Sequence, residues 1–124
     1  MRVPILQQGS YLIASIQSAL TDEELQQLSE DLVVQVSNTR AKGVVVDVTA
    51  LDVMDSFATR TVRDIAHMVK LRGAPTVVVG IQPNVAFTMV QLGLKLGDVM
   101  TALDLEEGLA LLDHYNSEEG KESR

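Results

Sequence analysis

Residues 43–60 read GVVVDVTALDVMDSFATR, and this stretch decides the fold. Its first part, Gly43 to Val48, is a nearly continuous apolar run. Such a run is typical of a strand in a parallel sheet whose two faces are both covered by helices. Apolar residues then recur at helical spacing through Ala58, Val62 and Ile65, which predicts a helix after the strand. The stretch therefore predicts a strand-to-helix turn, where α/β proteins tend to bind ligands.

Ser56 lies where that helix should begin. Its hydroxyl would be close to backbone N–H groups that have no partner inside the helix, and the positive helix end would favour a phosphoryl group. A serine at this place is also explained as an N-cap residue, worth ~1 kcal/mol. The spacing by itself favours the N-cap role, because serine is among the commonest caps, but it leaves both roles open.

The N-terminal part of the chain predicts a hairpin followed by a helix. Residues 3–7 and 10–17 have the composition of two strands, and Pro4 indicates that the first lies at a sheet edge. Thr21-Asp22-Glu23-Glu24 matches a capping box, so a helix should follow and stop before Gly43.

A third strand is predicted over residues 76–80, after Gly73-Ala74-Pro75 has ended the second helix. A strand, a helix and a strand of these lengths need a right-handed crossover between parallel strands. The carboxyl ends of the two strands then lie at one edge of the sheet. The turn at Asp55-Ser56 should therefore lie near the turn at 80–84.

The C-terminal part predicts two more helices. Pro83 favours a helix start, and residues 85–94 are apolar on nearly all helical faces, so the surplus either completes the core or forms a contact surface. A short strand is expected within 97–102, and Asp104-Leu105-Glu106-Glu107 matches a second capping box. Residues 116–124 are polar and lack periodicity, which predicts a loose tail.

The chain resembles the STAS family, the domain of anti-sigma-factor antagonists and sulfate-transporter tails. The resemblance lies in the segment VVVDVTALDVMDSFATR, followed by an amphipathic helix and then by the segment APTVVVGIQPNVA. The likeness is greatest to its small stressosome scaffold proteins. It covers roughly residues 3 to 113 and rests on Asp55-Ser56-Phe57 and Gly80-Ile81-Gln82-Pro83. It implies a single α/β domain over residues 1–115, with four helices and a mixed, mostly parallel sheet of about five strands that has an antiparallel edge hairpin.

The resemblance also implies a function. In that family the serine of the Asp-Ser motif accepts phosphate from a partner kinase, and by position this serine is Ser56. The implied partners are an RsbT-like serine kinase, RsbR-like STAS co-antagonists and a phosphatase, in a homo- and hetero-oligomeric stress-signalling complex. The protein itself would be non-catalytic, holding the kinase and releasing it on phosphorylation. The residues expected at the partner surface are Asp52, Asp55, Phe57, Thr59, Gln82, Pro83 and Asn84.

Composition limits the alternatives. A net charge of -7 argues against nucleic-acid binding, and aromatic residues make up only 3% of the chain, too few for base stacking. The absence of cysteine excludes disulfides and thiolate metal sites. The apolar runs at 44–48 and 76–81 are too short to span a bilayer, and no signal segment is evident. A cytoplasmic protein without membrane contact or cofactor is expected.

Two other functions remain open. Asp47, Asp52 and Asp55 could hold Mg²⁺ and accept phosphate, as in a two-component receiver. A receiver also needs an acidic pair after its first strand and a lysine after its last, and neither 11–17 nor 97–102 supplies them. A purely structural interaction domain is the other alternative. An enzyme is disfavoured, since the sequence has no P-loop, paired histidines or convincing triad.

Overall fold

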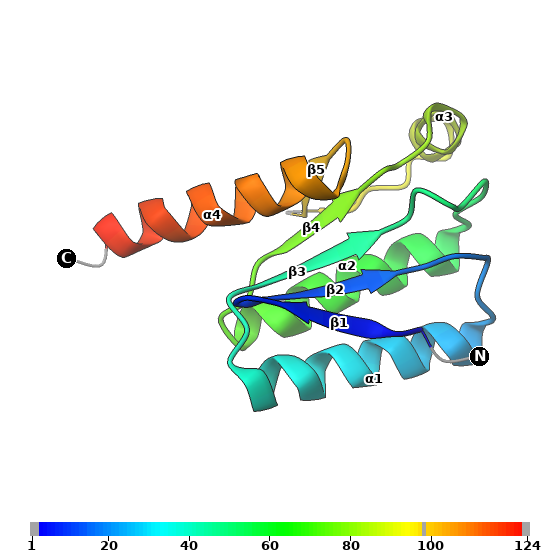
Figure 1. The fold of residues 1–124 in the computed structure, drawn as a ribbon. Coiled ribbons are helices and arrows are strands. Elements are labelled where there is room, and N and C mark those ends of the chain that lie inside the picture. The colour runs from blue at the N-terminus through cyan, green and yellow to red at the C-terminus, as the bar shows by residue number, and fades with distance from the viewer. Residues whose placement is uncertain (1–2, 98, 123–124) are drawn as a thin grey trace.

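The computed structural model describes residues 3–97 and 99–122 (Figure 1). The elements in chain order are β1 (Ile5–Gln8), β2 (Tyr11–Ser15), α1 (Asp22–Thr39), β3 (Gly43–Asp47), α2 (Ser56–Leu71), β4 (Thr76–Val79), α3 (Pro83–Gln91), β5 (Met100–Ala102) and α4 (Leu105–Glu122).

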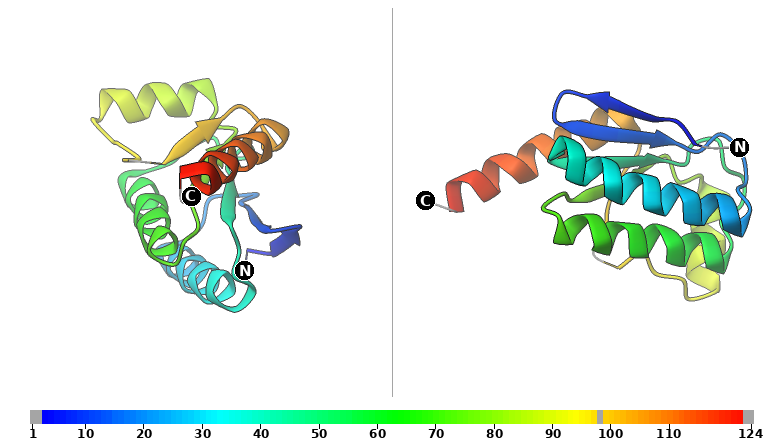
Figure 2. Two further views of the ribbon diagram at one scale, coloured as in Figure 1. Left: turned by 90° about the vertical axis from the view of Figure 1, so that its left-hand side faces the viewer. Right: turned by 90° about the horizontal axis from the view of Figure 1, so that it is seen from below.

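The five strands form one sheet in the order β1-β2-β3-β4-β5. β1 and β2 form an antiparallel hairpin, and every other neighbouring pair is parallel. α1 and α2 lie side by side on one face, whereas α4 covers the other (Figure 2). The predicted fold class, a mixed and mostly parallel sheet with an edge hairpin, is therefore confirmed.

Alternation along the strands divides the core into two layers, because successive side chains of a strand point to opposite faces. One layer packs under α1 and α2, and includes Leu12, Leu28, Leu32, Val44, Val46, Ile65 and Val78. The other packs under α4, and includes Ile13, Val45, Val77, Val79 and Leu112. The central valines are fully buried in both layers, as expected of strands covered on both faces.

α4 lies close to the sheet because it carries a glycine at the contact. A Cβ atom on Gly108 would lie 2.6 Å from Cγ1 of Val79, nearer than real side chains approach. The far part of α4 is held by polar contacts, since the Tyr11 hydroxyl donates to the Asp113 carboxylate and the Asn116 amide donates to the Lys42 carbonyl at 3.3 Å.

The start of α1 agrees with the prediction, and its end differs in one detail. Its capping box is present, because the Thr21 hydroxyl accepts from the Glu24 N–H at 3.1 Å and the Glu24 carboxylate accepts from the Thr21 N–H at 3.0 Å. The helix ends before Gly43, as predicted. The residue that ends it is Arg40, in the left-handed conformation with φ 53°, and Gly43 already belongs to β3.

The predicted tail is wrong for residues 116–122, which continue α4 as helix. The hydrogen bond from Asn116 to the Lys42 carbonyl extends the contact of α4 with the sheet past the last apolar residues. Residues 123 and 124 lie outside the described part of the chain.

Candidate functional site

The turn between β3 and α2 is closed by an aspartate. Asp55 is the N-cap of α2, in extended backbone conformation, and its carboxylate accepts from the Ala58 N–H at 2.8 Å. Ser56 is the first residue of the helix. The N-cap role considered for Ser56 therefore belongs to Asp55, which has a side-chain oxygen of equal capping strength and comes one residue earlier.

Because Asp55 caps the helix, the Ser56 hydroxyl is not used in capping. Ser56 is half-buried, and its side chain makes no hydrogen bond within the described part of the chain. The first N–H groups of a helix lack intrahelical acceptors, and here Asp55 accepts only from Ala58 and Thr59. The Ser56 side chain thus lies at the positive end of α2, where an anionic group is favoured.

The turns after β3 and β4 are hydrogen-bonded to each other. The Gln82 amide donates to the Thr49 carbonyl at 2.8 Å, and the Asn84 amide donates to the Asp52 carbonyl at 3.2 Å. The segment between β3 and α2, which ends at Asp55-Ser56, is therefore bonded to the turn at 80–84 through Thr49 and Asp52, as expected of turns that follow neighbouring parallel strands.

Thr49 was missed from the sequence, and Asp47 was considered only as a possible Mg²⁺ ligand, but the two residues together position this site. The Asp47 carboxylate accepts from the N–H of Thr49 at 2.9 Å and from its hydroxyl at 2.6 Å. Thr49 then lies directly on Gly80, where an added Cβ would be 1.9 Å from the Thr49 hydroxyl. An Asp two residues before a Thr at a strand end is the signature of an Asx turn, and that signal could have revealed the pair.

The expected partner-surface residues are not all at the surface. Asp52, Asp55, Pro83 and Asn84 are exposed, and Phe57 and Gln82 are half-buried. The prediction that Thr59 lies at the partner surface is wrong. Thr59 is 1% exposed and its hydroxyl donates to the Asp55 carbonyl at 2.9 Å, because it lies one turn into α2 on the side that faces the core. It therefore cannot contribute to a contact surface.

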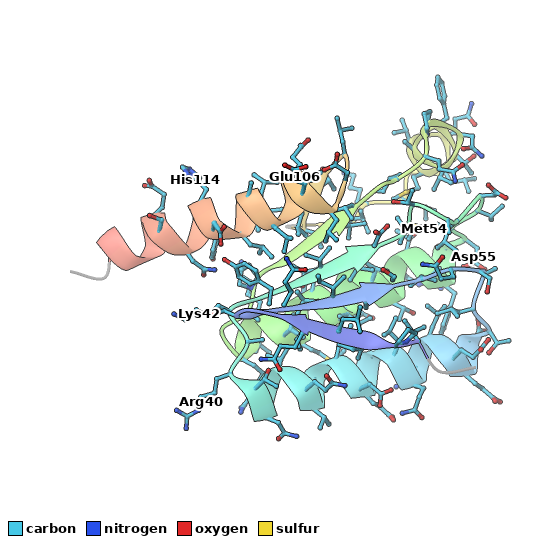
Figure 3. The ribbon with its side chains drawn as sticks, in the orientation of Figure 1. Arg40, Lys42, Met54, Asp55, Glu106 and His114 are labelled. Atoms are coloured by element: carbon cyan, nitrogen blue, oxygen red, sulfur yellow. The ribbon has the colours of Figure 1, made fainter. Side chains whose placement is uncertain are left out.

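Apolar side chains are exposed on α3 and just beyond it. Only Val85 and Met89 of α3 are buried, whereas Phe87 is 71% exposed and Val90 is 80% exposed. α3 lies beyond the carboxyl end of β4, and Figure 3 shows Asp55 at that end of the sheet, opposite Arg40 and Lys42. Most of the apolar side chains that exceed what the core needs are therefore exposed on α3, which is bonded through Asn84 to the segment between β3 and α2.

No metal site is formed by the residues that the structure describes, since no three His, Cys, Asp or Glu side chains gather in a group that could hold an ion. Within residues 3–97 and 99–122, none of the helices combines the length and the apolar character needed to cross a bilayer.

The strand-turn-helix arrangement matches a known domain. The family model of the STAS domain matches residues 2–107. The chain belongs to the STAS family. The resemblance expected from Asp55-Ser56-Phe57 and Gly80-Ile81-Gln82-Pro83 is thereby confirmed.

Solved STAS structures share this fold over almost the whole chain. A serine-to-glutamate variant of RsbS from Moorella thermoacetica is 37% identical, with a TM-score of 0.81 over 94% of this chain and 99% of that one. A chain in the molecular architecture of the stressosome, a signal integration and transduction hub, is 36% identical, with a TM-score of 0.74 over 91% and 98%. The anti-sigma factor antagonist SpoIIAA, at 12% identity and a TM-score of 0.67, shows the fold alone.

A longer relative matches part of this STAS domain. RsbRA of Bacillus subtilis, named an RsbT co-antagonist protein, is 31% identical over 87 residues, which are 70% of this chain and 32% of RsbRA. The chain thus spans about a third of the length of RsbRA.

Proposed function

We propose that this STAS domain is a non-catalytic scaffold that binds a serine kinase and releases it when Ser56 is phosphorylated. The observation that carries the proposal is that Asp55, and not Ser56, caps the start of α2. Asp55 caps the helix, so the half-buried Ser56 hydroxyl has no hydrogen bond to give up within the described chain when it accepts phosphate. The amino end of the helix would stabilise the product.

Phosphorylation would change partner affinity rather than unfold the domain. A phosphoserine carries ~1.5 to 2 negative charges, and the helix end offsets part of that charge. Asp52 and Asp55 are exposed on the same turn and would repel the rest. A partner held at this surface would therefore face a much stronger negative field. A change of ~1.4 kcal/mol is enough for a tenfold loss of affinity.

The relatives suggest which partners to test. We propose an RsbT-like serine kinase, RsbR-like STAS co-antagonists and a resetting phosphatase, in a cytoplasmic homo- and hetero-oligomeric assembly. Support comes from a relative named an RsbT co-antagonist and from a 36%-identical chain in a stressosome structure. The contact surface that we propose consists of Asp52, Asp55, Phe57, Gln82, Pro83 and Asn84, and it is supported by the bonds that join Asp52, Gln82 and Asn84 across the two turns.

Site mapping after a kinase assay tests the assignment. Incubation with an RsbT-like kinase and ATP should place one phosphate on the wild-type chain and none on Ser56→Ala. Ser18→Ala is the matched control, because Ser18 is exposed and lines a shallow hollow with Asp52. This variant should be labelled normally. Mass spectrometry that finds the phosphate on another residue rejects Ser56 as the acceptor.

The stability of the label separates serine from aspartate chemistry. A phosphoserine survives acid, whereas a phosphoaspartate does not. Acid-labile labelling by acetyl phosphate, without a kinase, would support the receiver alternative instead.

A further inference from the structure

Arg60 lies one helical turn after Ser56 on α2. Residues four apart on a helix lie on the same face, and their side chains are neighbours. Long side chains on a helix also point back toward its amino end, over the residues three and four earlier. Arg60 is exposed and Ser56 is half-buried, so the guanidinium is able to reach the surface around the Ser56 hydroxyl.

The guanidinium of Arg60 has no structural task in the fold. It makes no hydrogen bond or ion pair within the described part of the chain. The next two arginines differ, because Arg63 donates to the Lys95 carbonyl at 3.4 Å and Arg72 donates to the Ser37 hydroxyl at 3.1 Å. Arg63 and Arg72 thus connect α2 to other segments, whereas the N–H donors of Arg60 are available to an anion from outside.

The carboxylates around Arg60 are weak competitors for it. Arg60 lines a groove of about 710 Å³ between α1 and α2, and Glu30 and Asp64 are the acidic residues among the groove's described lining. Neither is ion-paired with Arg60 in the residues that the structure describes. A phosphate carries ~1.5 to 2 negative charges and accepts two parallel hydrogen bonds from one guanidinium. It should therefore attract Arg60 more strongly than either carboxylate does.

We propose that Arg60 binds the phosphate on Ser56 through a bidentate pair of charge-assisted hydrogen bonds. This inference rests on the proposed phosphorylation of Ser56, and it names the side chain that the product engages. The order of the two groups is the favourable one, because the anion precedes the cation by one turn. Phosphorylation thereby moves the positive charge of Arg60 from the groove toward the start of α2.

The test measures the second pKa of the phosphoserine at position 56 by ³¹P NMR, in the full chain with the phosphoserine installed during translation. A cation close to the phosphate favours its dianion and lowers this pKa, whose ordinary value is about 6. Arg60→Gln should therefore raise the pKa by about 0.4 units or more at low salt, and the difference should shrink in about 1 M salt. An equal or lower pKa in Arg60→Gln overturns the proposal.

Two further variants separate the pair from a general effect of charge. Lys70→Gln is the charge-matched control, because Lys70 is exposed in the last turn of the same helix. Its phosphate should titrate as in wild type, and a rise equal to that of Arg60→Gln would overturn the proposal. Arg60→Lys keeps the charge but lacks the planar fork, so it should give an intermediate pKa.

The Arg60 Nε–H resonance gives a second measurement that needs no substitution. It should shift on phosphorylation and follow the titration of the phosphate, whereas the Arg63 resonance should not, because Arg63 is bonded to the Lys95 carbonyl. An Arg60 resonance that is unchanged by phosphorylation overturns the proposal. These outcomes are independent of the kinase assay, which alone tests whether Ser56 is the natural acceptor.

Discussion

Asp55 and Ser56 are adjacent, but the structure gives them different tasks. The Asp55 carboxylate bonds to the Ala58 N–H and fixes the start of α2, which leaves the Ser56 hydroxyl without a structural role in the described chain. Serine and aspartate cap helices about equally well, so sequence alone could not decide which of the two neighbours is the cap.

Substitutions at these two positions should therefore differ in stability. Asp55→Ala should lower the free energy of unfolding by about 1 kcal/mol, since the cap is lost, whereas Asp55→Asn should retain most of it. Ser56→Ala should change it by less than about 0.5 kcal/mol. Urea denaturation followed by circular dichroism measures all three. A Ser56→Ala loss as large as that of Asp55→Ala would show that Ser56 stabilises the helix start.

Gly80 should tolerate no side chain. It has φ 80°, and an added Cβ would lie 1.9 Å from the Thr49 hydroxyl. Gly80→Ala should therefore lower the free energy of unfolding by more than about 2 kcal/mol, because backbone strain and a steric clash add together.

Gly73→Ala is the matched control for this substitution in the same denaturation experiment. Gly73 has φ 91° and nothing within 4 Å of its Cβ position, so only the backbone term of roughly 1 to 2 kcal/mol applies. Equal losses in the two variants would contradict the close contact between Thr49 and Gly80.

At the scale of helices and strands, the sequence predicted the features that depend on neighbouring residues, such as helix caps, and those that depend on the order of strands and helices along the chain. The capping box at Thr21, the helix start at Pro83 and the parallel pairing of β3 with β4 are all present. The left-handed Arg40 was not predictable, because nothing in that residue type favours the conformation. The position of the C-terminal part of α4 depends on hydrogen bonds from Asn116 to Tyr11 and Lys42, which are distant in the sequence and cannot be predicted from a local pattern.

The bond between Tyr11 and Asp113 ties α4 to β2, and it predicts a pH dependence. Burial first, and then the hydrogen bond to Asp113, raise the pKa of Tyr11 above its ordinary value of 10.0. Folding therefore favours the neutral phenol. This contribution to stability is fully present below pH 10.0 and is lost as the pH rises through the folded-state pKa.

Tyr11→Phe removes this contribution. Near neutral pH the variant should be about 1 kcal/mol less stable than wild type, because the hydrogen bond is lost. The difference between the two proteins should shrink as the pH is raised above 10.0, in urea denaturation at a series of pH values. A difference that stays constant across that range would exclude the linkage.

At the scale of the whole molecule, the two ends of α2 face different surroundings. One end carries Ser56 near the exposed carboxylates of Asp52 and Asp55, and the other borders a hollow that is lined in part by Lys70, Thr76 and Met100. The first could be predicted, because adjoining parallel strands bring both turns to one edge. The second could not, since its lining comes from α2, β4, β5 and α4, and depends on how short β5 is.

The charge of the whole domain also favours an electrostatic switch. With a net charge of -7, the chain should bind a partner through a basic surface, and added salt should weaken that complex. Ser56→Asp adds a charge at the same turn and should weaken kinase binding, although less than a phosphate because its charge is smaller. Isothermal titration at two salt concentrations measures both effects. Tighter binding by Ser56→Asp would be inconsistent with repulsion at this turn.

The most direct test is the affinity of the RsbT-like kinase for the unmodified chain and for the same chain phosphorylated at Ser56, measured by titration calorimetry under identical conditions. We expect binding at least about tenfold weaker after phosphorylation, with an unchanged circular dichroism spectrum. Equal or tighter binding of the phosphorylated chain would contradict the proposal that Ser56 is a release switch.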